Sequence, residues 1–309
     1  MQDGTREPVY MPGKCEAKRN EAVVVETKLP ETIEPGRYLC FRSAKQDMKF
    51  YIDGEFRQEY STKESRIFGR MSAVAYIFLE IRDEDRGKVL RVEMQTDSSY
   101  SGIFYTVYYG NPIGVWYRFF KQYGLELLVA FVTLILSIIA IIGSMTLRFY
   151  YHRRVALEYL GCGILIAAVW LITNSVFRQL IFPNLSIIND ITFLMIMLLS
   201  LPYLLYMNEI QKYRYNRAYQ IMESIVIINF LACSVLHMTG ICDFTDTISY
   251  VSVFCILSIV LMVMTILLDF HRGMVREYTF VSVGMFCVSV AAFVQIIIYF
   301  QRICFQKKK

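Results

Sequence analysis

The chain has 309 residues, of which 55% are hydrophobic and 19% are charged, and its mean hydropathy is +0.40. About a quarter of a typical soluble domain is charged, so these averages indicate a membrane protein. The hydrophobic content excludes intrinsic disorder, and the lack of sequence repeats excludes collagen and coiled-coil fibres. The net charge of +5 is scattered in short clusters between apolar runs, which favours membrane topology over nucleic-acid binding.

Charge divides the chain into two parts. Residues 1–122 contain 19 Lys or Arg and 18 Asp or Glu, whereas residues 123–309 contain 13 and 9. We therefore expect two domains, a water-facing domain over residues 1–115 and a membrane-embedded bundle over residues 116–309.

The first domain is predicted to be all-β, because runs rich in Val, Ile, Phe and Tyr alternate with Pro, Gly, Asp and charged clusters. Asp53-Gly54 lies between two such runs and predicts a hairpin, since a two-residue primed turn needs positive φ. Leu90, Val92 and Met94 alternate with polar residues, which predicts a strand with one buried face. Seven or eight strands of this kind favour an antiparallel, jelly-roll-like sandwich; the runs are 22–27, 37–42, 49–52, 56–60, 73–81, 89–95 and 103–109.

Two cysteines lie in this domain, Cys15 and Cys40. An exported domain can hold a disulfide between them. In the alternative, Cys40 is an apolar strand residue and Cys15 is a free thiol. Their spacing does not decide between the two.

The second domain contains six long apolar stretches. A helix needs roughly 20 such residues to cross a hydrocarbon core of about 30 Å, and a helix satisfies its own backbone hydrogen bonds in lipid. The sequence therefore predicts an all-α polytopic bundle of six spans, over residues 125–147, 159–177, 187–207, 221–241, 248–268 and 278–300.

Basic residues in the short links predict the orientation of the bundle. If the first span runs inward, the cytoplasmic links hold eight Lys or Arg and the other side seven, or three without Arg302 and the terminal lysines. This arrangement makes the N-terminal domain extracytoplasmic. It also leaves Lys307–Lys309 outside, so we expect the chain to stop before a further helix. Residues 1–20 lack the pattern of a signal peptide, so we expect a mis-assigned or clipped start, or export by the first span.

Polar residues within the predicted spans are candidates for interhelical bonding or for signal relay, because such groups are costly in lipid unless they face the bundle interior. His237 lies close to the outer boundary of its span, which favours a hydrated interfacial residue over a proton switch. Arg178 is a stronger functional candidate, with interfacial snorkelling as its alternative. Pro202 is expected to kink the third span. The polar set comprises Asn174, Arg178, Gln179, Asn229, His237 and Gln295.

No catalytic constellation is visible in the sequence. The three histidines are far apart, no His-Glu-x-x-His or Cys-x-x-Cys pair is present, and neither a P-loop nor a Gly-x-Ser-x-Gly elbow occurs. We therefore predict no catalytic residue, metal or cofactor. The acidic residues Glu126, Glu158, Glu223 and Asp269 lie near span ends, where contact with headgroups or water is the simpler explanation.

Five stretches carry a family resemblance, at residues 38–43, 50–55, 95–102, 174–184 and 206–211. Over these stretches the organisation resembles the bacterial seven-transmembrane receptors with diverse intracellular signalling modules, in particular clostridial-type members with a GGDEF diguanylate cyclase or a histidine kinase after the last helix. That resemblance implies a sensory sandwich, a relaying bundle and a cytoplasmic output enzyme. The chain departs from the family in lacking a leading hydrophobic segment, a final helix and any output motif, so no catalytic residue is carried over.

The sequence thus predicts a multi-pass sensor in a bacterial plasma membrane, whose partners are the lipid bilayer, an extracytoplasmic small molecule and a cytoplasmic output domain, with a homodimer as one possible assembly. Fold analogy alone suggests a carbohydrate ligand. Tyr51, Tyr100, Tyr105 and Tyr109 would stack on a sugar ring or, alternatively, form the sandwich core. The competing classes are a transporter, a stand-alone integral membrane subunit and a cyclase.

Overall fold

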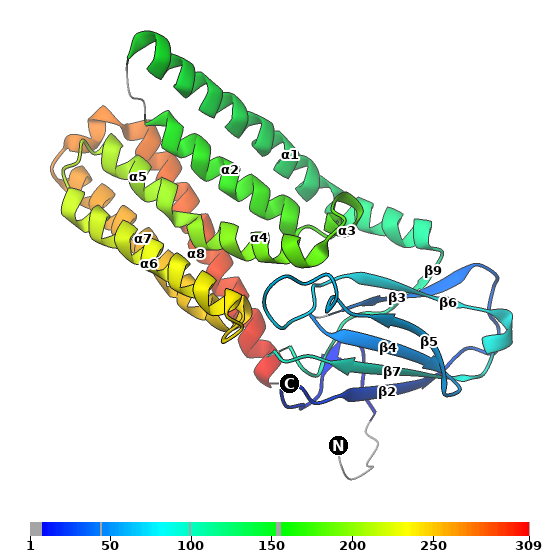
Figure 1. Ribbon diagram of the computed structural model, residues 1–309. Coiled ribbons are helices and arrows are strands. Elements are labelled where there is room, and N and C mark those ends of the chain that lie inside the picture. Colours follow the sequence, from blue (N-terminus) through cyan, green and yellow to red (C-terminus); the bar gives the residue numbers. More distant parts are fainter. Residues whose placement is uncertain (1–7, 44, 99, 153–155, 309) are drawn as a thin grey trace. The chain divides into compact units, whose positions relative to one another are not determined.

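The computed structural model describes residues 8–43, 45–98, 100–152 and 156–308. The chain divides into two compact units (Figure 1). The first unit contains all the described strands, the first part of helix α1 as far as Leu125, and Val176–Asn189. The second unit contains Glu126–Ser175 and Asp190–Lys309. The chain therefore passes from the first unit to the second, returns for 14 residues, and enters the second again.

The strands of the first unit pair antiparallel throughout the described residues. One sheet has the order β2-β7-β4-β5, a second has the order β6-β3-β9, and β1 pairs with β8. The strands are β1 Gly13–Lys14, β2 Val23–Lys28, β3 Arg37–Arg42, β4 Asp47–Ile52, β5 Glu55–Tyr60, β6 Tyr76–Ile81, β7 Val89–Gln95, β8 Ile103–Phe104 and β9 Tyr108–Gly110, with a short 3-10 helix η1 at Asp83–Asp85.

The local sequence explains two of these elements directly. Asp53 and Gly54 join β4 to β5 with φ of 48° and 84°, so the predicted hairpin is confirmed, and both residues adopt the left-handed conformation that a primed turn needs. Along β7, Leu90, Val92 and Met94 are buried while their neighbours are more exposed. The predicted alternation is therefore also confirmed.

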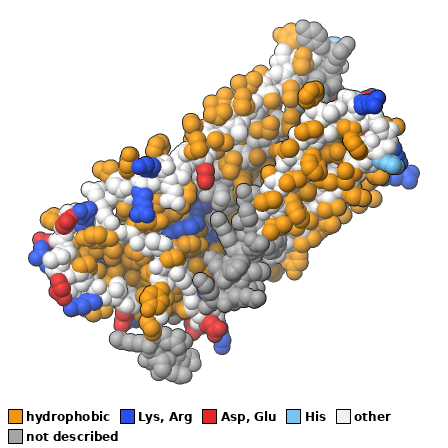
Figure 2. Space-filling model, turned by 180° about the vertical axis from the view of Figure 1, so that it is seen from behind, with side chains coloured by type: hydrophobic (Ala, Val, Ile, Leu, Met, Phe, Trp, Pro, Cys, Tyr) orange, Lys and Arg blue, Asp and Glu red, His pale blue; other side chains and the backbone are white. Residues whose placement is uncertain are grey.

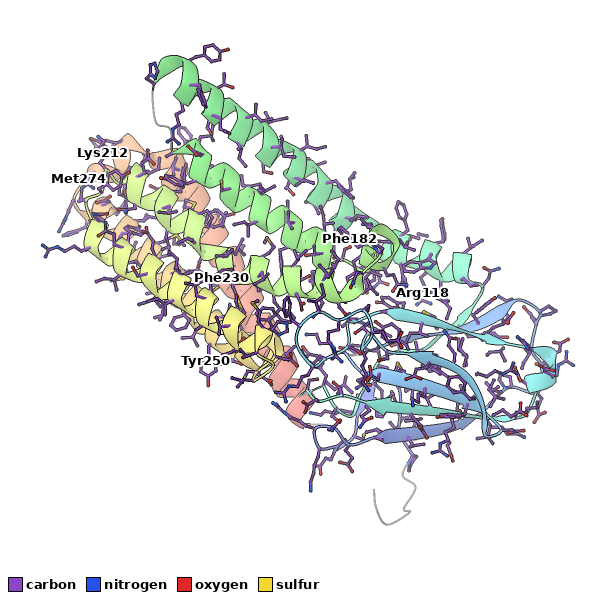
Figure 3. The ribbon with its side chains drawn as sticks, viewed as in Figure 1. Arg118, Phe182, Lys212, Phe230, Tyr250 and Met274 are labelled. Atoms are coloured by element: carbon purple, nitrogen blue, oxygen red, sulfur yellow. The ribbon has the colours of Figure 1, made fainter. Side chains whose placement is uncertain are left out.

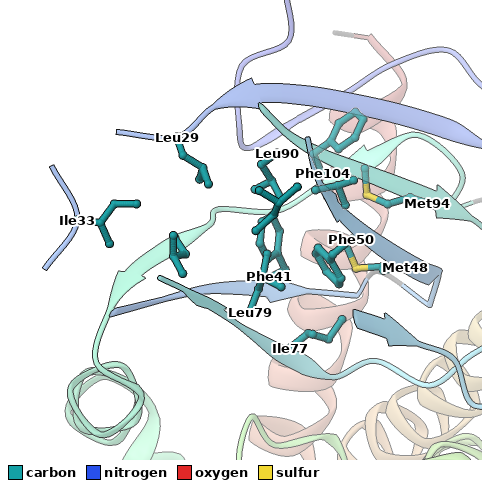
Figure 4. Close-up of a cluster of buried hydrophobic side chains, with 13 residues drawn as sticks. Leu29, Ile33, Phe41, Met48, Phe50, Ile77, Leu79, Leu90, Met94 and Phe104 are labelled. Atoms are coloured by element: carbon teal, nitrogen blue, oxygen red, sulfur yellow. The ribbon is translucent and has the colours of Figure 1, made fainter. Parts of the chain in front are cut away.

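One hydrophobic core lies between the two larger sheets (Figure 4). Phe41 and Leu79 come from the three-stranded sheet, and Phe50 and Leu90 come from the four-stranded sheet. Because both sheets contribute buried side chains to the same cluster, they form the two layers of one β domain.

The helical part consists of long apolar helices joined by short links. Within the described residues, five helical stretches are long and apolar enough to cross a membrane, and the apolar part of α8 at Thr279–Val294 is shorter. Five of the six predicted spans thus meet the length requirement. The helices are α1 Pro112–Tyr151, α2 Leu157–Asn174, α3 Arg178–Ile181, α4 Leu185–Leu198, α5 Ser200–Ile210, α6 Asn216–Met238, α7 Phe244–His271 and α8 Thr279–Lys308, with a 3-10 turn η2 at Met274–Glu277.

The third apolar stretch is interrupted where the sequence predicts a kink. Helix α4 ends at Leu198 and α5 begins at Ser200, four and two residues before Pro202. Proline has no N–H to bond the carbonyl four residues earlier, and its ring clashes with that carbonyl. Pro202 therefore lies in the first turn of a new helix, where no such bond is required.

Hydrophobic side chains cover much of the outer surface of the helices, whereas charged side chains are frequent on the β domain (Figure 2). Between 11% and 28% of each of the five apolar segments is buried inside the chain. In water, exposed apolar surface of this extent would be unstable, but lipid stabilises it. Both the length and the exposure of these helices are those of a membrane protein.

Candidate functional site

Gln179, in the link between α2 and α4, forms hydrogen bonds with the edge of a β-sheet. The backbone N–H of Tyr76 donates to Gln179 Oε1 at 2.7 Å, and Gln179 Nε2 donates to the Tyr76 carbonyl at 3.2 Å. Tyr76 is the first residue of β6, which is an edge strand of the order β6-β3-β9. The side-chain amide thus takes the place of a neighbouring strand and satisfies backbone groups that an edge leaves unpaired.

Arg178 adds a second connection in the same unit. Its Nη2 donates to the Val74 carbonyl at 2.7 Å, and the side chain is only 8% exposed. Asn184 Nδ2 donates to the Ser65 carbonyl at 3.0 Å. Burial, together with the like charge of Arg42, lowers the pKa of Arg178 to about 10. Arg178 is therefore a buried residue of the β unit and does not snorkel to an interface.

Aromatic side chains from α1 and the same link pack on the sheet that contains β6. The rings of Tyr76 and Phe119 lie 4.7 Å apart, and those of Trp116 and Phe177 lie 6.3 Å apart. Phe119 is fully buried. The beginning of α1 and the α2–α4 link are consequently parts of one packed structure with the β domain.

The four tyrosines expected at a ligand site lie apart on four segments. Each ring is covered by a basic side chain, and none belongs to the buried core cluster. The alternative role in the sandwich core is therefore wrong for these rings, and their role in ligand binding stays a prediction; the basic side chains lie over ring faces on which a sugar would stack. The pairs are Arg91 with Tyr51 at 5.9 Å, Lys45 with Tyr100 at 4.9 Å, Arg42 with Tyr105 at 4.3 Å and Arg37 with Tyr109 at 5.9 Å.

His237, near the end of α6, is buried between two carboxylates. Its Nε2 lies 3.3 Å from Asp190 Oδ1 on α4, and its Nδ1 lies 3.3 Å from Asp243 Oδ1 at the start of α7. The ring stacks on Phe244 with centroids 3.9 Å apart. These contacts have ion-pair distances without hydrogen-bond alignment. His237 is 5% exposed, so the expectation of a hydrated interfacial residue is wrong, because three helices enclose it.

A larger polar network surrounds Asp269 near the end of α7. Asp269 is 0% exposed and accepts hydrogen bonds from Arg214, Tyr215 and Tyr278. The bond from the Tyr215 hydroxyl is 2.9 Å long. The expectation that Asp269 contacts headgroups or water is therefore wrong, because side chains from two links of the bundle cover it.

The network continues from Tyr278 into the bundle. Gln211 Nε2 donates to the Tyr278 hydroxyl at 3.4 Å, and the Tyr219 hydroxyl donates to Gln211 Oε1 at 2.9 Å. Tyr219 also shares a 2.7 Å hydrogen bond with Thr265. Figure 3 shows the labelled Lys212 and Met274 at the end of the bundle where these segments meet. The network connects the end of α5, the start of α6, the end of α7 and the start of α8.

For the remaining polar candidates, the described residues show no bonds between helices. Asn174 is exposed at the end of α2. Asn229 Oδ1 accepts a hydrogen bond from Cys233 Sγ at 3.6 Å within the same helix. Among the described residues, Asn229 shows no hydrogen bond to another helix. The side chain of Gln295 lies outside the described residues.

Cys15 and Cys40 are free thiols, so the predicted disulfide is not formed. Cys40 is fully buried on β3, where it pairs with Phe78 and Tyr108, and burial raises the pKa of its thiol to about 12. Cys15 follows β1, and its N–H donates to the Gly102 carbonyl at 2.9 Å. The alternative prediction, that Cys40 is an apolar residue of a strand, is therefore confirmed.

The sequence contained a signal for the Asp269 network that composition alone did not identify. Residues 206–211 mix aromatic, amide and acidic side chains at the end of an apolar run, and Tyr215 and Tyr219 follow one helical turn apart. Polar residues in that pattern at a span end indicate partners on neighbouring helices.

Comparisons with protein families, with curated proteins and with solved structures found no match.

Proposed function

We propose that the chain is a multi-pass membrane sensor whose β domain detects an extracytoplasmic ligand and whose helices relay the signal to a cytoplasmic output domain. The observation that carries this proposal is the position of Val176–Asn189. This segment belongs to the β unit, yet α2 precedes it and α4 continues out of it into the helical unit. Helix α1 likewise begins in the β unit and ends in the helical unit.

These connections give a change in the β domain a mechanical route into two helices. Ligand binding that favours one packing of the β6 edge, where Gln179 is bonded, would bias the helices on either side of the link. Only a ligand with different affinities for the two packings can shift their populations. The buried Asp269 network joins four helical segments, and we propose it as the element whose packing changes.

The finer architecture belongs to this proposal. If β8 and β9 are two halves of one interrupted strand, the second layer has the order β1-β8/β9-β3-β6 beside β2-β7-β4-β5, and we assign this order to the jelly-roll class. We also propose α8 as a sixth span in a bacterial plasma membrane. The output domain, a diguanylate cyclase or a histidine kinase, is proposed on the resemblance to the receptor family alone.

Coupling between the units is tested with full-length chain in lipid nanodiscs. Replacing Gln179 with Leu removes both bonds to Tyr76, and we expect altered amide hydrogen exchange in peptides containing residues 211–219. The control is Gln95→Leu, since Gln95 is also in the β unit but, within the described part of the chain, its amide bonds to the exposed Asn20. Unchanged exchange at 211–219 in Gln179→Leu would contradict the relay.

A transporter is the second candidate, and the cluster of buried His237 and Asp243 with the partly exposed Asp190 favours it, because ionisable groups within spans often mark transport pathways. Solute flux by the purified chain in proteoliposomes would support transport and contradict a pure sensor.

The proposed orientation of the bundle has its own test. A reporter that is active only outside the cytoplasm, fused after Gln211, should stay inactive.

A further inference from the structure

Arg178 is a buried cation without a counter-charge. Its side chain makes one hydrogen bond among the described residues, to the backbone carbonyl of Val74, and no described carboxylate lies within ion-pair distance. A guanidinium has five N–H donors, and a buried one is normally paired with a carboxylate or another anion. The remaining donors of Arg178 therefore lack the partner that burial of a charge requires.

A second arginine lies at the same corner of the sheet. Arg42 ends β3 and is paired in register with Tyr76, the residue whose backbone Gln179 holds. The guanidinium of Arg42 lies 4.3 Å from the ring centre of Tyr105 and makes no ion pair with a described acidic residue. Gln179 adjoins Arg178 in the chain, and the positive charge of Arg42 acts on Arg178 strongly enough to lower its pKa, so the two guanidinium groups belong to one corner.

The other titratable groups near Arg178 do not neutralise it. They are the phenols of Tyr60 and Tyr76, and burial raises the pKa of Tyr60 to about 12, so its hydroxyl is uncharged at pH 7. The Tyr60 hydroxyl donates to the Ala73 carbonyl at 2.9 Å, which fixes the loop before β6. The corner thus carries two positive charges among neutral phenols.

We infer that this corner, formed by Arg42 and Arg178, binds a phosphate group. Two guanidinium groups match the charge of about −1.5 to −2 that a phosphate monoester carries at pH 7. Each guanidinium also has N–H donors in one plane that can bond two phosphate oxygens at once. The inference deepens the proposed function, because the phosphate would be the recognised part of the sensed ligand.

A small cavity beside Arg42 offers no room for a larger ligand. It has a volume of about 20 Å³ and is lined by Arg42, Tyr105 and core residues that include Phe41 and Met48, without Arg178. That space holds little more than one water molecule, so we expect the rest of the ligand to stay outside the β domain. The phosphate can therefore belong to a free solute or to a lipid headgroup.

The test uses the full chain in nanodiscs of phosphatidylcholine, titrated with inorganic phosphate at constant ionic strength while the midpoint of thermal unfolding is recorded. We expect a saturable rise in the midpoint, and at least a tenfold weaker response in Arg42→Gln. The matched control is Arg91→Gln, because Arg91 also lies over a tyrosine ring on the same domain and has its own carboxylate partner, Glu93. Arg178→Lys keeps the positive charge but loses the paired planar N–H donors. We expect its response to phosphate to lie between those of the wild type and Arg42→Gln.

A second set of nanodiscs, containing phosphatidic acid, whose headgroup is a phosphate monoester, separates the two sources. If a lipid headgroup is the occupant, these discs raise the midpoint of the wild type but not of Arg42→Gln, and added phosphate has no further effect. A response that is absent in both kinds of disc, or equal in Arg42→Gln and Arg91→Gln, overturns the inference. Saturable binding without a change in hydrogen exchange at 211–219 would uphold the phosphate site and contradict the relay.

Discussion

The side-chain amide of Gln179 pairs with both backbone groups of Tyr76, a residue 103 positions earlier in the chain. The two hydrogen bonds satisfy the backbone N–H and carbonyl of the first residue of the edge strand β6 with one side chain from a link between two helices. At this residue, a strand from another chain cannot form the same two bonds.

Removing this amide should loosen the start of β6. We expect Gln179→Leu to destabilise the β unit by about 1 kcal/mol for each lost hydrogen bond, with more for the backbone groups left unpaired. The measurement is amide hydrogen exchange of the peptide containing Tyr76, which should become faster. Gln95→Leu removes an exposed amide and should leave that peptide unchanged. Equal exchange in the two variants would show that Gln179 does not protect the edge.

The thiol of Cys40 should be unreactive over the whole range of pH in which the protein is handled. Burial raises its pKa to about 12, so the thiolate fraction is small below that value and grows only as pH rises towards it. With iodoacetamide at pH 8, we expect the half-buried Cys15 to be labelled before Cys40, and tryptic mass spectrometry measures both. A disulfide-linked peptide pair from non-reduced protein would contradict the free thiols of the structure.

The strands and spans were largely predictable because their signals are local. The alternation of Leu90, Val92 and Met94 predicted β7 with its bounds, and the Asp53-Gly54 pair predicted the turn before β5. The run 103–109 was predicted as one strand, but the structure divides it into β8 and β9, which pair with different partners. Length and apolarity likewise predicted the five long helices, and Pro202 predicted the break between α4 and α5.

The candidate sites were less predictable because they depend on contacts between distant residues. The residues next to Asp269 do not show that Arg214, 55 positions earlier, covers it, so its position at a span end suggested water. His237 is enclosed in the same way by residues of α4 and α7. Periodicity identifies a buried face, but it does not identify the partner on the other helix.

Asp269 should be the most sensitive carboxylate of the helical unit. Asp269→Ala leaves the Arg214 guanidinium and the hydroxyls of Tyr215 and Tyr278 without their shared acceptor, and breaking a buried ion pair costs about 3–5 kcal/mol. We expect a large fall in the midpoint of thermal unfolding in detergent. Glu277→Gln is the control, because the exposed Glu277 pairs with Lys212 at the surface and its loss should change the midpoint little.

A double-mutant cycle tests whether these residues act as one network. Asp269→Asn and Tyr278→Phe each remove one side of a hydrogen bond, so their effects on the unfolding free energy should be non-additive by about 0.5–3 kcal/mol. Additive effects would mean that the two side chains contribute separately.

His237 should hold Asp190 and Asp243 together through its charge. His237→Asn keeps a polar side chain but leaves the buried Asp243 and the partly exposed Asp190 without a cation between them. We expect the variant to unfold at a lower temperature in detergent, by an amount equivalent to several kcal/mol if both aspartates stay charged. His271→Asn changes an exposed histidine at the end of α7 and should have little effect.

Removing one of the carboxylates provides the decisive comparison. In the double variant His237→Asn with Asp243→Asn, the repulsion between the aspartates is lost, so part of the stability lost in His237→Asn should return. Packing of the ring on Phe244 is lost in both variants and therefore cancels in this comparison. If the double variant is less stable than His237→Asn by the full cost of Asp243→Asn alone, the histidine acts through its stacking and not through its charge.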